Sequence, residues 1–187
     1  LFDDAFQLRM LHEVEAVPPG EARADYVVYA NRLFDPTKRF EDKVGVAYGG
    51  PDLSDRNLAV LERFLSQARS AQALKECGGD TAATAALPLS ATGDIHSGRM
   101  AAEYLLRGAS SFQVHTLFQL PDGEFAMRGG GKTEKALHRL LFHPEDGFIA
   151  WILDLRERLG WRREANVKAM AAWCRENWRQ AIEPLIH

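Results

Sequence analysis

Two short segments carry residue types that could bind an anion, and the first is the turn formed by Thr92, Gly93 and Asp94. A glycine turn leaves backbone N–H groups uncovered, and such amides favour an anion without any net positive charge. The second segment ends an apolar run at His115 and Thr116, which would add further amides and a hydroxyl group. If the two apolar runs are neighbouring parallel strands, their ends lie side by side, so the spacing predicts a phosphate site.

Such a site needs parallel strands with helices between them, and the pattern of the chain supplies both. Strands are expected at residues 25–30, 85–91 and 112–116, where short apolar runs are bounded by turn residues. Helices are expected at 3–15, about 56–70, 97–107, 133–142, about 146–159 and about 163–183. The alternation of helices and strands predicts an α/β architecture with a parallel sheet.

Several finer expectations follow for the first third of the chain. The helix at 3–15 should bury Phe6, Met10 and Leu11 on one face. The strand at 25–30 reads as apolar throughout and should be buried on both faces, as strands of parallel sheets are.

The connections differ in length. Residues 32–55 are rich in glycine and read as an irregular loop, which is typical of functional or mobile segments. Ser54 or Asp55 should cap the following helix, while Ser97 and Gly108 should bound the helix at 97–107. Residues 76–84 read as a turn, and 119–131 as a hairpin-like or lid-like excursion.

Composition sets limits on the function. The formal net charge of −3 over 187 residues gives no field that favours nucleic acid or an anionic membrane. Cys77 and Cys174 are far apart, which fits a reducing compartment, and no stretch is long and apolar enough to span a bilayer. We therefore expect a cytoplasmic protein. The chain begins at Leu1 and runs directly into a helical pattern, as a fragment or processed subunit would.

Residues 92–116 resemble the dihydroorotate dehydrogenase and dihydropyrimidine dehydrogenase family of FMN-binding TIM barrels. The likeness rests on the turn at Gly93, a Gly108-Ala109 pair and the strand end from Gln113 to Thr116. A second block agrees, since residues 26–31 resemble the family's sixth strand and residues 47–54 resemble its flavin loop. The resemblance covers about residues 24–118.

This resemblance implies a fold and a division of the chain. Residues 1–118 would be the C-terminal portion of a (β/α)8 barrel, containing strands six to eight. Residues 119–187 would be a loop excursion and C-terminal helices that pack on the barrel or on a partner. Only about three of eight strands would be present, whereas a closed barrel needs all of them.

The resemblance also implies roles for single residues. Gly93 and Asp94 would present amides to the FMN phosphate, His115 and Thr116 would close its other side, and Gly49 and Gly50 would approach the ribityl chain or the phosphate. The substrate ring would face Asn31, while Arg32 would pair with an anionic substrate or simply with Asp35. Asp94 departs from the family's glycine, so its carboxylate must turn away from the phosphate.

The implied activity is FMN-mediated oxidoreduction of a carbon–carbon bond in a pyrimidine-like small molecule, a reaction of pyrimidine metabolism. The family's lysine and general base lie on earlier strands and would come from outside this chain, from the missing barrel half. The expected partner is therefore either a second copy of this chain, in a homo-oligomer, or that barrel half. Two alternatives stay open: a non-catalytic half-barrel that serves in assembly, and a phosphate-binding barrel enzyme without flavin.

Other motifs favour structural roles. Lys132 follows a glycine run, but the first glycine that a nucleotide-binding P-loop requires is replaced by Ala126. His138, His143 and Cys174 match no zinc spacing, so no metal site is expected. The tryptophans at 161, 173 and 178 have both basic and acidic neighbours, which favours a packing or subunit-contact helix over a nucleic-acid surface.

Overall fold

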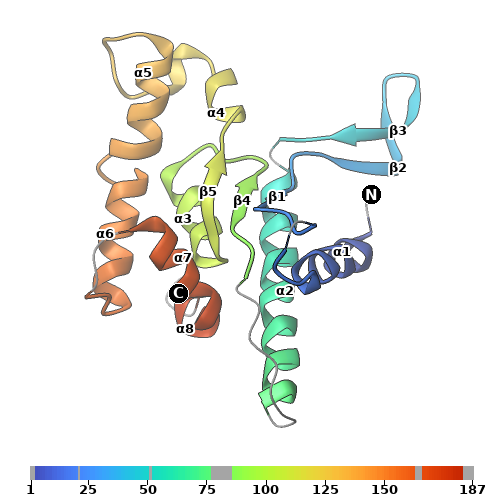
Figure 1. Ribbon diagram of the computed structural model, residues 1–187. Helices are drawn as coiled ribbons and strands as arrows, with labels where there is room; N and C mark the ends of the chain where they lie inside the picture. The colour runs from blue at the N-terminus through green and yellow to red at the C-terminus, as the bar shows by residue number, and fades with distance from the viewer. Residues whose placement is uncertain (1–2, 21, 51, 77–85, 163–165, 183–187) are drawn as a thin grey trace.

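A sheet of three parallel strands lies at the centre of the structure, a computed structural model that describes residues 3–20, 22–50, 52–76, 86–162 and 166–182. Its strands are β1 (Val27–Tyr29), β4 (Leu89–Thr92) and β5 (Ala109–Gln113), in the order β1-β4-β5. The predicted α/β architecture with a parallel sheet is confirmed, and all carboxyl ends of the strands point the same way (Figure 1).

Two helices lie in the crossover connections between the parallel strands. Helix α2 (Asp52–Glu76) leads from β1 towards β4, and α3 (Gly98–Leu106) leads from β4 to β5. The boundaries of α3 are as predicted, because the Ser97 hydroxyl accepts a hydrogen bond from the Met100 N–H and Gly108 adopts the left-handed backbone that ends a helix. The turn that the sequence predicts at residues 76–84 lies almost wholly outside the described residues.

The two faces of the sheet differ. The register places Tyr29, Ala91 and Phe112 in one row, and Tyr29 and Ala91 belong to the core shared with α2 and α3. The neighbouring row contains Val28, Ser90 and Ser111, of which Ser90 is buried and the other two are exposed. The expectation that the first strand is buried on both faces is therefore wrong, because the helical core covers the Tyr29 row and leaves Val28 43% exposed.

Helix α1 (Asp4–Ala16) forms where expected, with the Asp3 carboxylate accepting from the Ala5 N–H at 2.9 Å. Of the predicted apolar face, Leu11 is buried, whereas Phe6 and Met10 are 39% and 40% exposed. The other buried side chains of this helix are Gln7 and Leu8.

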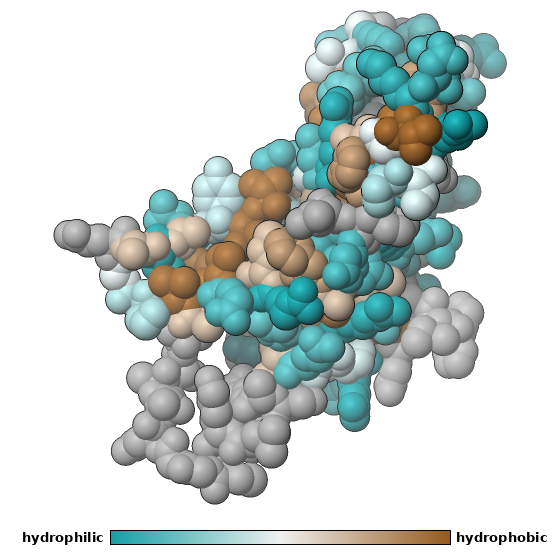
Figure 2. Space-filling model, turned by 90° about the vertical axis from the view of Figure 1, so that its right-hand side faces the viewer, coloured by the Kyte–Doolittle hydropathy of each residue, from teal (hydrophilic) through white to brown (hydrophobic). Residues whose placement is uncertain are grey.

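Contacts with α2 fix this rotation of α1. Arg56 binds the Asp4 carboxylate, and the His12 ring lies 4.8 Å from the Phe64 ring. Seen from the side of α1 and the β2–β3 hairpin, apolar side chains remain on the surface (Figure 2).

Residues 33–48 form an antiparallel hairpin, where an irregular loop was predicted. Strands β2 (Leu33–Phe40) and β3 (Lys43–Tyr48) pair with a register shift between Asp35 and Arg39, and Gly45 has a φ of +80°. This bulge and this glycine interrupt the alternation of apolar and polar residues by which a strand is recognised.

The next helix begins earlier than predicted. Helix α2 starts at Asp52, so neither Ser54 nor Asp55 caps it, and it extends to Glu76. Its expected apolar face at Leu58, Leu61 and Leu65 is buried.

After β5 the chain is helical. Strand β5 ends at Gln113, three residues before the predicted end, since Thr116 begins the short helix α4 (Thr116–Gln119). The following elements are η1 (Asp122–Glu124), α5 (Lys132–Leu137), η2 (His138–Phe142), α6 (Phe148–Arg158), α7 (Val167–Glu176) and α8 (Trp178–Ile182). The helix expected over 163–183 therefore divides at Asn177.

The C-terminal helices pack on the sheet and on α3. Helix α6 contacts α3, and α7 contacts both α3 and β5, so one apolar core includes residues from both halves of the chain. Trp161 and Trp173 pack edge to face with ring centroids 5.6 Å apart, in keeping with the packing role favoured for these residues.

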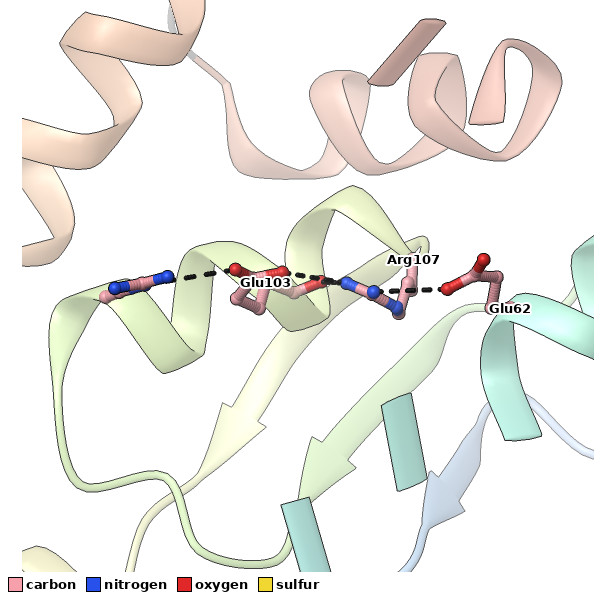
Figure 3. A network of polar contacts seen from close by, with 4 residues as sticks. Glu62, Glu103 and Arg107 are labelled. Carbon is pink, nitrogen blue, oxygen red and sulfur yellow. Dashed lines mark hydrogen bonds and ion pairs between the residues drawn. The ribbon is translucent and has the colours of Figure 1, made fainter. Parts of the chain in front are cut away.

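A row of charges joins the outer helices. Arg107 of α3 binds Glu103 at 2.9 Å and Glu62 of α2 at 3.2 Å, and Glu103 also contacts Arg99 (Figure 3). The row thus links α2 to α3. None of the described helices has the length and apolar character that crossing a bilayer requires.

Candidate functional site

A pocket of about 400 Å³ lies at the carboxyl ends of the parallel strands. In Figure 1 the β2–β3 hairpin and the α4–α5 segment stand on opposite sides of these strand ends. Every residue that the sequence proposed for the site lies on the pocket lining: Asn31, Arg32, Gly49, Gly50, Gly93, Asp94, His115 and Thr116. Ligands of α/β proteins bind at this edge of the sheet, because the loops that follow the strands converge there.

Gly93 is the residue of this lining that the fold constrains most. It has a φ of +103°, and its carbonyl accepts a hydrogen bond of 3.0 Å from the Tyr104 hydroxyl. A Cβ at this position would lie 2.7 Å from Nδ2 of Asn57 and 2.8 Å from the Ala30 carbonyl oxygen. Only glycine therefore fits the turn.

Asn57 of α2 holds two strand ends together, a role that the sequence reading missed. Its Nδ2 group donates to the carbonyl oxygen of Ala30 at 3.0 Å and to that of Thr92 at 3.1 Å. The side chain is fully buried. The signal in the sequence is a polar residue on the apolar face of a helix, four positions after Leu53 and four before Leu61, both of which are buried.

Asp94 is held by two neighbours. The backbone of Asp94 has a φ of 54°, and its carboxylate is buried. The Oδ2 atom accepts a hydrogen bond from the Ser54 hydroxyl at 3.3 Å, and the Oδ1 atom lies 3.3 Å from Nδ1 of His96. Ser54, expected as a helix cap, instead helps to engage this carboxylate. His96 follows the turn but is not part of the pocket lining.

The wall after β1 carries Asn31 and Arg32, which are both exposed. Pairing of Arg32 with Asp35 was one expected alternative, and no such ion pair occurs. Asp35 instead accepts hydrogen bonds from the hydroxyl and the N–H of Thr37 and from the N–H of Lys38, and these bonds, led by that of the hydroxyl, lower the pKa of Asp35. No acidic side chain in the described part of the chain forms an ion pair with Arg32, which is exposed on the pocket lining.

The opposite wall comes from the end of β5 and from α4. His115 is exposed, Thr116 is half-buried, and Gln113 and Gln119 add amide groups beside them. Together with Thr92, these side chains make the lining rich in hydrogen-bond donors and acceptors. Gly49 and Gly50 complete the rim below the hairpin, and Gly50 has a φ of +95° with open space where a side chain would be.

Cys174 and His143, two of the residues considered for a metal site, have structural surroundings. The described residues contain no group of three or more metal-ligating side chains. Cys174 is buried, and burial raises the pKa of its thiol to about 12. The Nδ1 atom of His143 accepts from the backbone N–H groups of Glu145 and Asp146, which is a structural contact.

Comparison of the chain with models of protein families, with curated proteins and with solved structures yields no match. The function of the pocket has to be inferred from its own geometry and from the sequence motifs that converge on it.

Proposed function

We propose that the pocket binds the phosphate and ribityl chain of FMN, and that the chain is the C-terminal, phosphate-binding part of a flavoprotein like the dihydroorotate dehydrogenases. The supporting observation is that motif residues far apart in the sequence, from Asn31 to Thr116, line one pocket at the carboxyl ends of β1, β4 and β5. That edge is where barrels of this class bind phosphate.

The phosphate would lie between the turn at Gly93 and the start of α4. The main-chain amides of Gly93 and Asp94 would donate from one side, and the amide and hydroxyl of Thr116 from the other. The Asp94 carboxylate contacts Ser54 and His96, and these contacts support the role of this residue as an amide donor. The anion is favoured by dipoles and hydrogen bonds, in keeping with a chain whose net charge is −3.

The substrate would lie on the side of Asn31 and Arg32. An amide, and a guanidinium with no ion pair to a described residue, would recognise the ring amide and the negative charge of a pyrimidine-like acid. The flavin would supply hydride transfer, and the residues of this chain would orient the flavin and the substrate. In this proposal the general base and the flavin-contacting lysine come from the remaining barrel strands.

Titration of the purified protein with FMN in a calorimeter tests this proposal. Thr116→Ala should weaken FMN binding by about tenfold or more, since a hydrogen bond to a charged group contributes roughly 1.5–3 kcal/mol. The matched control is Thr133→Ala on α5, an exposed threonine outside the pocket, which should bind as the parent does. Equal FMN affinity in all three proteins, or no FMN binding by the parent, would contradict the proposal.

A second variant separates the phosphate from the substrate. Arg32→Ala should leave FMN affinity within about twofold and weaken binding of orotate to the FMN-loaded protein, because it removes the cation proposed to face the substrate. Arg39→Ala, which removes an exposed arginine of the hairpin that does not line the pocket, is the control. Loss of FMN binding in Arg32→Ala would indicate that Arg32 contacts the phosphate and not the substrate.

A further inference from the structure

The hairpin carries an exposed aromatic face that begins at the pocket. Phe34 pairs directly with Ala47 across the hairpin, and Phe40 pairs with Lys43. Paired residues share a face, and positions 43, 45 and 47 alternate onto that same face. The face that carries Phe34, Phe40, Gly45 and Ala47 is here called the hairpin face. Because Ala47 lines the pocket, the hairpin face is continuous with the pocket wall.

The side chains of the hairpin face remain uncovered. Phe34 is 45% exposed and Phe40 is 65% exposed. A Cβ on Gly45 would lie 3.2 Å from Cζ of Phe34, so the Phe34 ring lies against the bare backbone of this glycine.

The extent of this face favours a small ligand over a second copy of the chain. Each phenylalanine can bury on the order of 150–250 Å², whereas a stable protein interface buries about 1,200–2,000 Å² in total. Gly45 is two residues from Ala47, which is about 7 Å along the strand. A group attached to a phosphate in the pocket reaches that far if the ligand is the size of a nucleotide.

We propose that the hairpin face binds the planar ring of the ligand whose phosphate lies in the pocket, with Phe34 as the stacking residue. The ligand class is therefore a phosphate ester that carries an aromatic ring. This inference rests on the proposed function, in which the ring is that of FMN; a nucleotide base would offer the same combination of ring and phosphate.

Three probes distinguish binding at the hairpin face from binding at the phosphate site. They are FMN, AMP and ribose 5-phosphate, which lacks an aromatic ring. The parent protein should bind FMN at least about tenfold more tightly than ribose 5-phosphate, since stacking of one ring on an aromatic side chain changes affinity by about that factor or more. Phe34→Ala should abolish this difference and leave the affinity for ribose 5-phosphate unchanged. Phe34→Trp should retain it. AMP affinity equal to that for FMN would identify the stacked group as any flat heterocycle, which still supports the proposal.

Phe142→Ala is the matched control, because Phe142 is 61% exposed on η2 and is not part of the pocket lining. Unchanged FMN affinity in Phe34→Ala, with ribose 5-phosphate still bound, would overturn the ring site and leave the phosphate site standing. Failure of the parent to bind any of the three probes would overturn the proposed function itself. A change in sedimentation of both Phe34→Ala and Phe40→Ala, without a change in ligand affinity, would assign the hairpin face to a second copy and overturn the inference.

Discussion

One hydroxyl group supports the turn on which the candidate site depends. Tyr104 is fully buried and donates to the Gly93 carbonyl oxygen from the helix that follows the turn. This hydrogen bond ties the backbone of the turn to α3. Residues outside the lining therefore help to shape it.

Tyr104→Phe should destabilise the protein by about 1–3 kcal/mol, because the buried carbonyl of Gly93 loses its donor. The control is Tyr26→Phe, which removes a hydroxyl from an exposed tyrosine and should have no measurable effect. Chemical denaturation followed by circular dichroism measures both. Equal stability of the two variants would show that the hydroxyl does not hold the turn.

Alkaline pH should weaken the fold through the same residue. Burial raises the pKa of Tyr104 from 10.0 to about 12, so the unfolded chain releases this proton at a lower pH than the folded chain. The stability contribution is present below pH 10 and is lost as the pH rises from about 10 to 12. The pKa of Tyr29 is raised by burial as well and adds to the loss. The denaturation midpoint should fall in this range, and less steeply in Tyr104→Phe.

At the scale of elements, close backbone contacts fix how α3 meets α6. A Cβ on Gly98, the first residue of α3, would lie 2.0 Å from the backbone N of Phe148 and 2.5 Å from the carbonyl oxygen of Asp146. Backbone atoms of another element cannot move aside as a flexible side chain would. The position of α3, and with it the Gly93 turn, depends on this glycine.

Gly98→Ala should therefore cost about 3 kcal/mol or more, although alanine is the better helix former. Gly123→Ala is the control, since nothing lies within 4 Å of the added methyl group. Thermal denaturation should show a melting temperature lowered by about 6–12 °C for Gly98→Ala, at 2–4 °C per kcal/mol for a chain of this length. A melting temperature equal to that of Gly123→Ala would mean that α3 and α6 pack differently.

The local sequence pattern was sufficient to predict most of the elements that carry the site. The strands that end at Tyr29 and Thr92 and the helix after Ser97 are specified by neighbouring residues, and the predicted strand ends differ from these by one residue. The third strand was expected at 112–116 and lies at Ala109–Gln113. The hairpin was missed because Gly45 and a bulge break its alternation. Asn57 was missed because its partners, Ala30 and Thr92, are far away in the sequence and become neighbours only in the folded chain.

At the scale of the whole molecule, Arg175 connects the C-terminal helices to the first half of the chain. From α7 its guanidinium donates to the Leu87 carbonyl oxygen at 2.6 Å, forms an ion pair with Glu15 of α1 and lies over the Phe64 ring. Gly108 leaves room for it, since a Cβ there would meet Cγ of Arg175 at 2.2 Å. A single side chain thus contacts segments from four parts of the sequence.

Arg175→Ala should lower the free energy of unfolding by about 2–3 kcal/mol, because Leu87 and Glu15 lose a charged donor in a largely buried place. Arg175→Lys should recover little, since an ammonium group cannot donate in the planar geometry of a guanidinium. Arg179→Ala, on the exposed surface of α8, serves as the control. Urea denaturation of the variants measures the differences in the free energy of unfolding. Full stability of Arg175→Lys would contradict a role for the planar set of guanidinium N–H donors.

The distribution of tryptophan has a practical consequence. Trp151, Trp161, Trp173 and Trp178 are all the tryptophans of the chain, and they lie beyond the sheet in sequence. Intrinsic fluorescence therefore reports on the last quarter of the polypeptide, while the peptide chromophore reports on every part. Since one core joins both halves, the emission curve and the circular dichroism curve should coincide on heating, and a separation between them would reveal that the C-terminal helices melt as an independent unit.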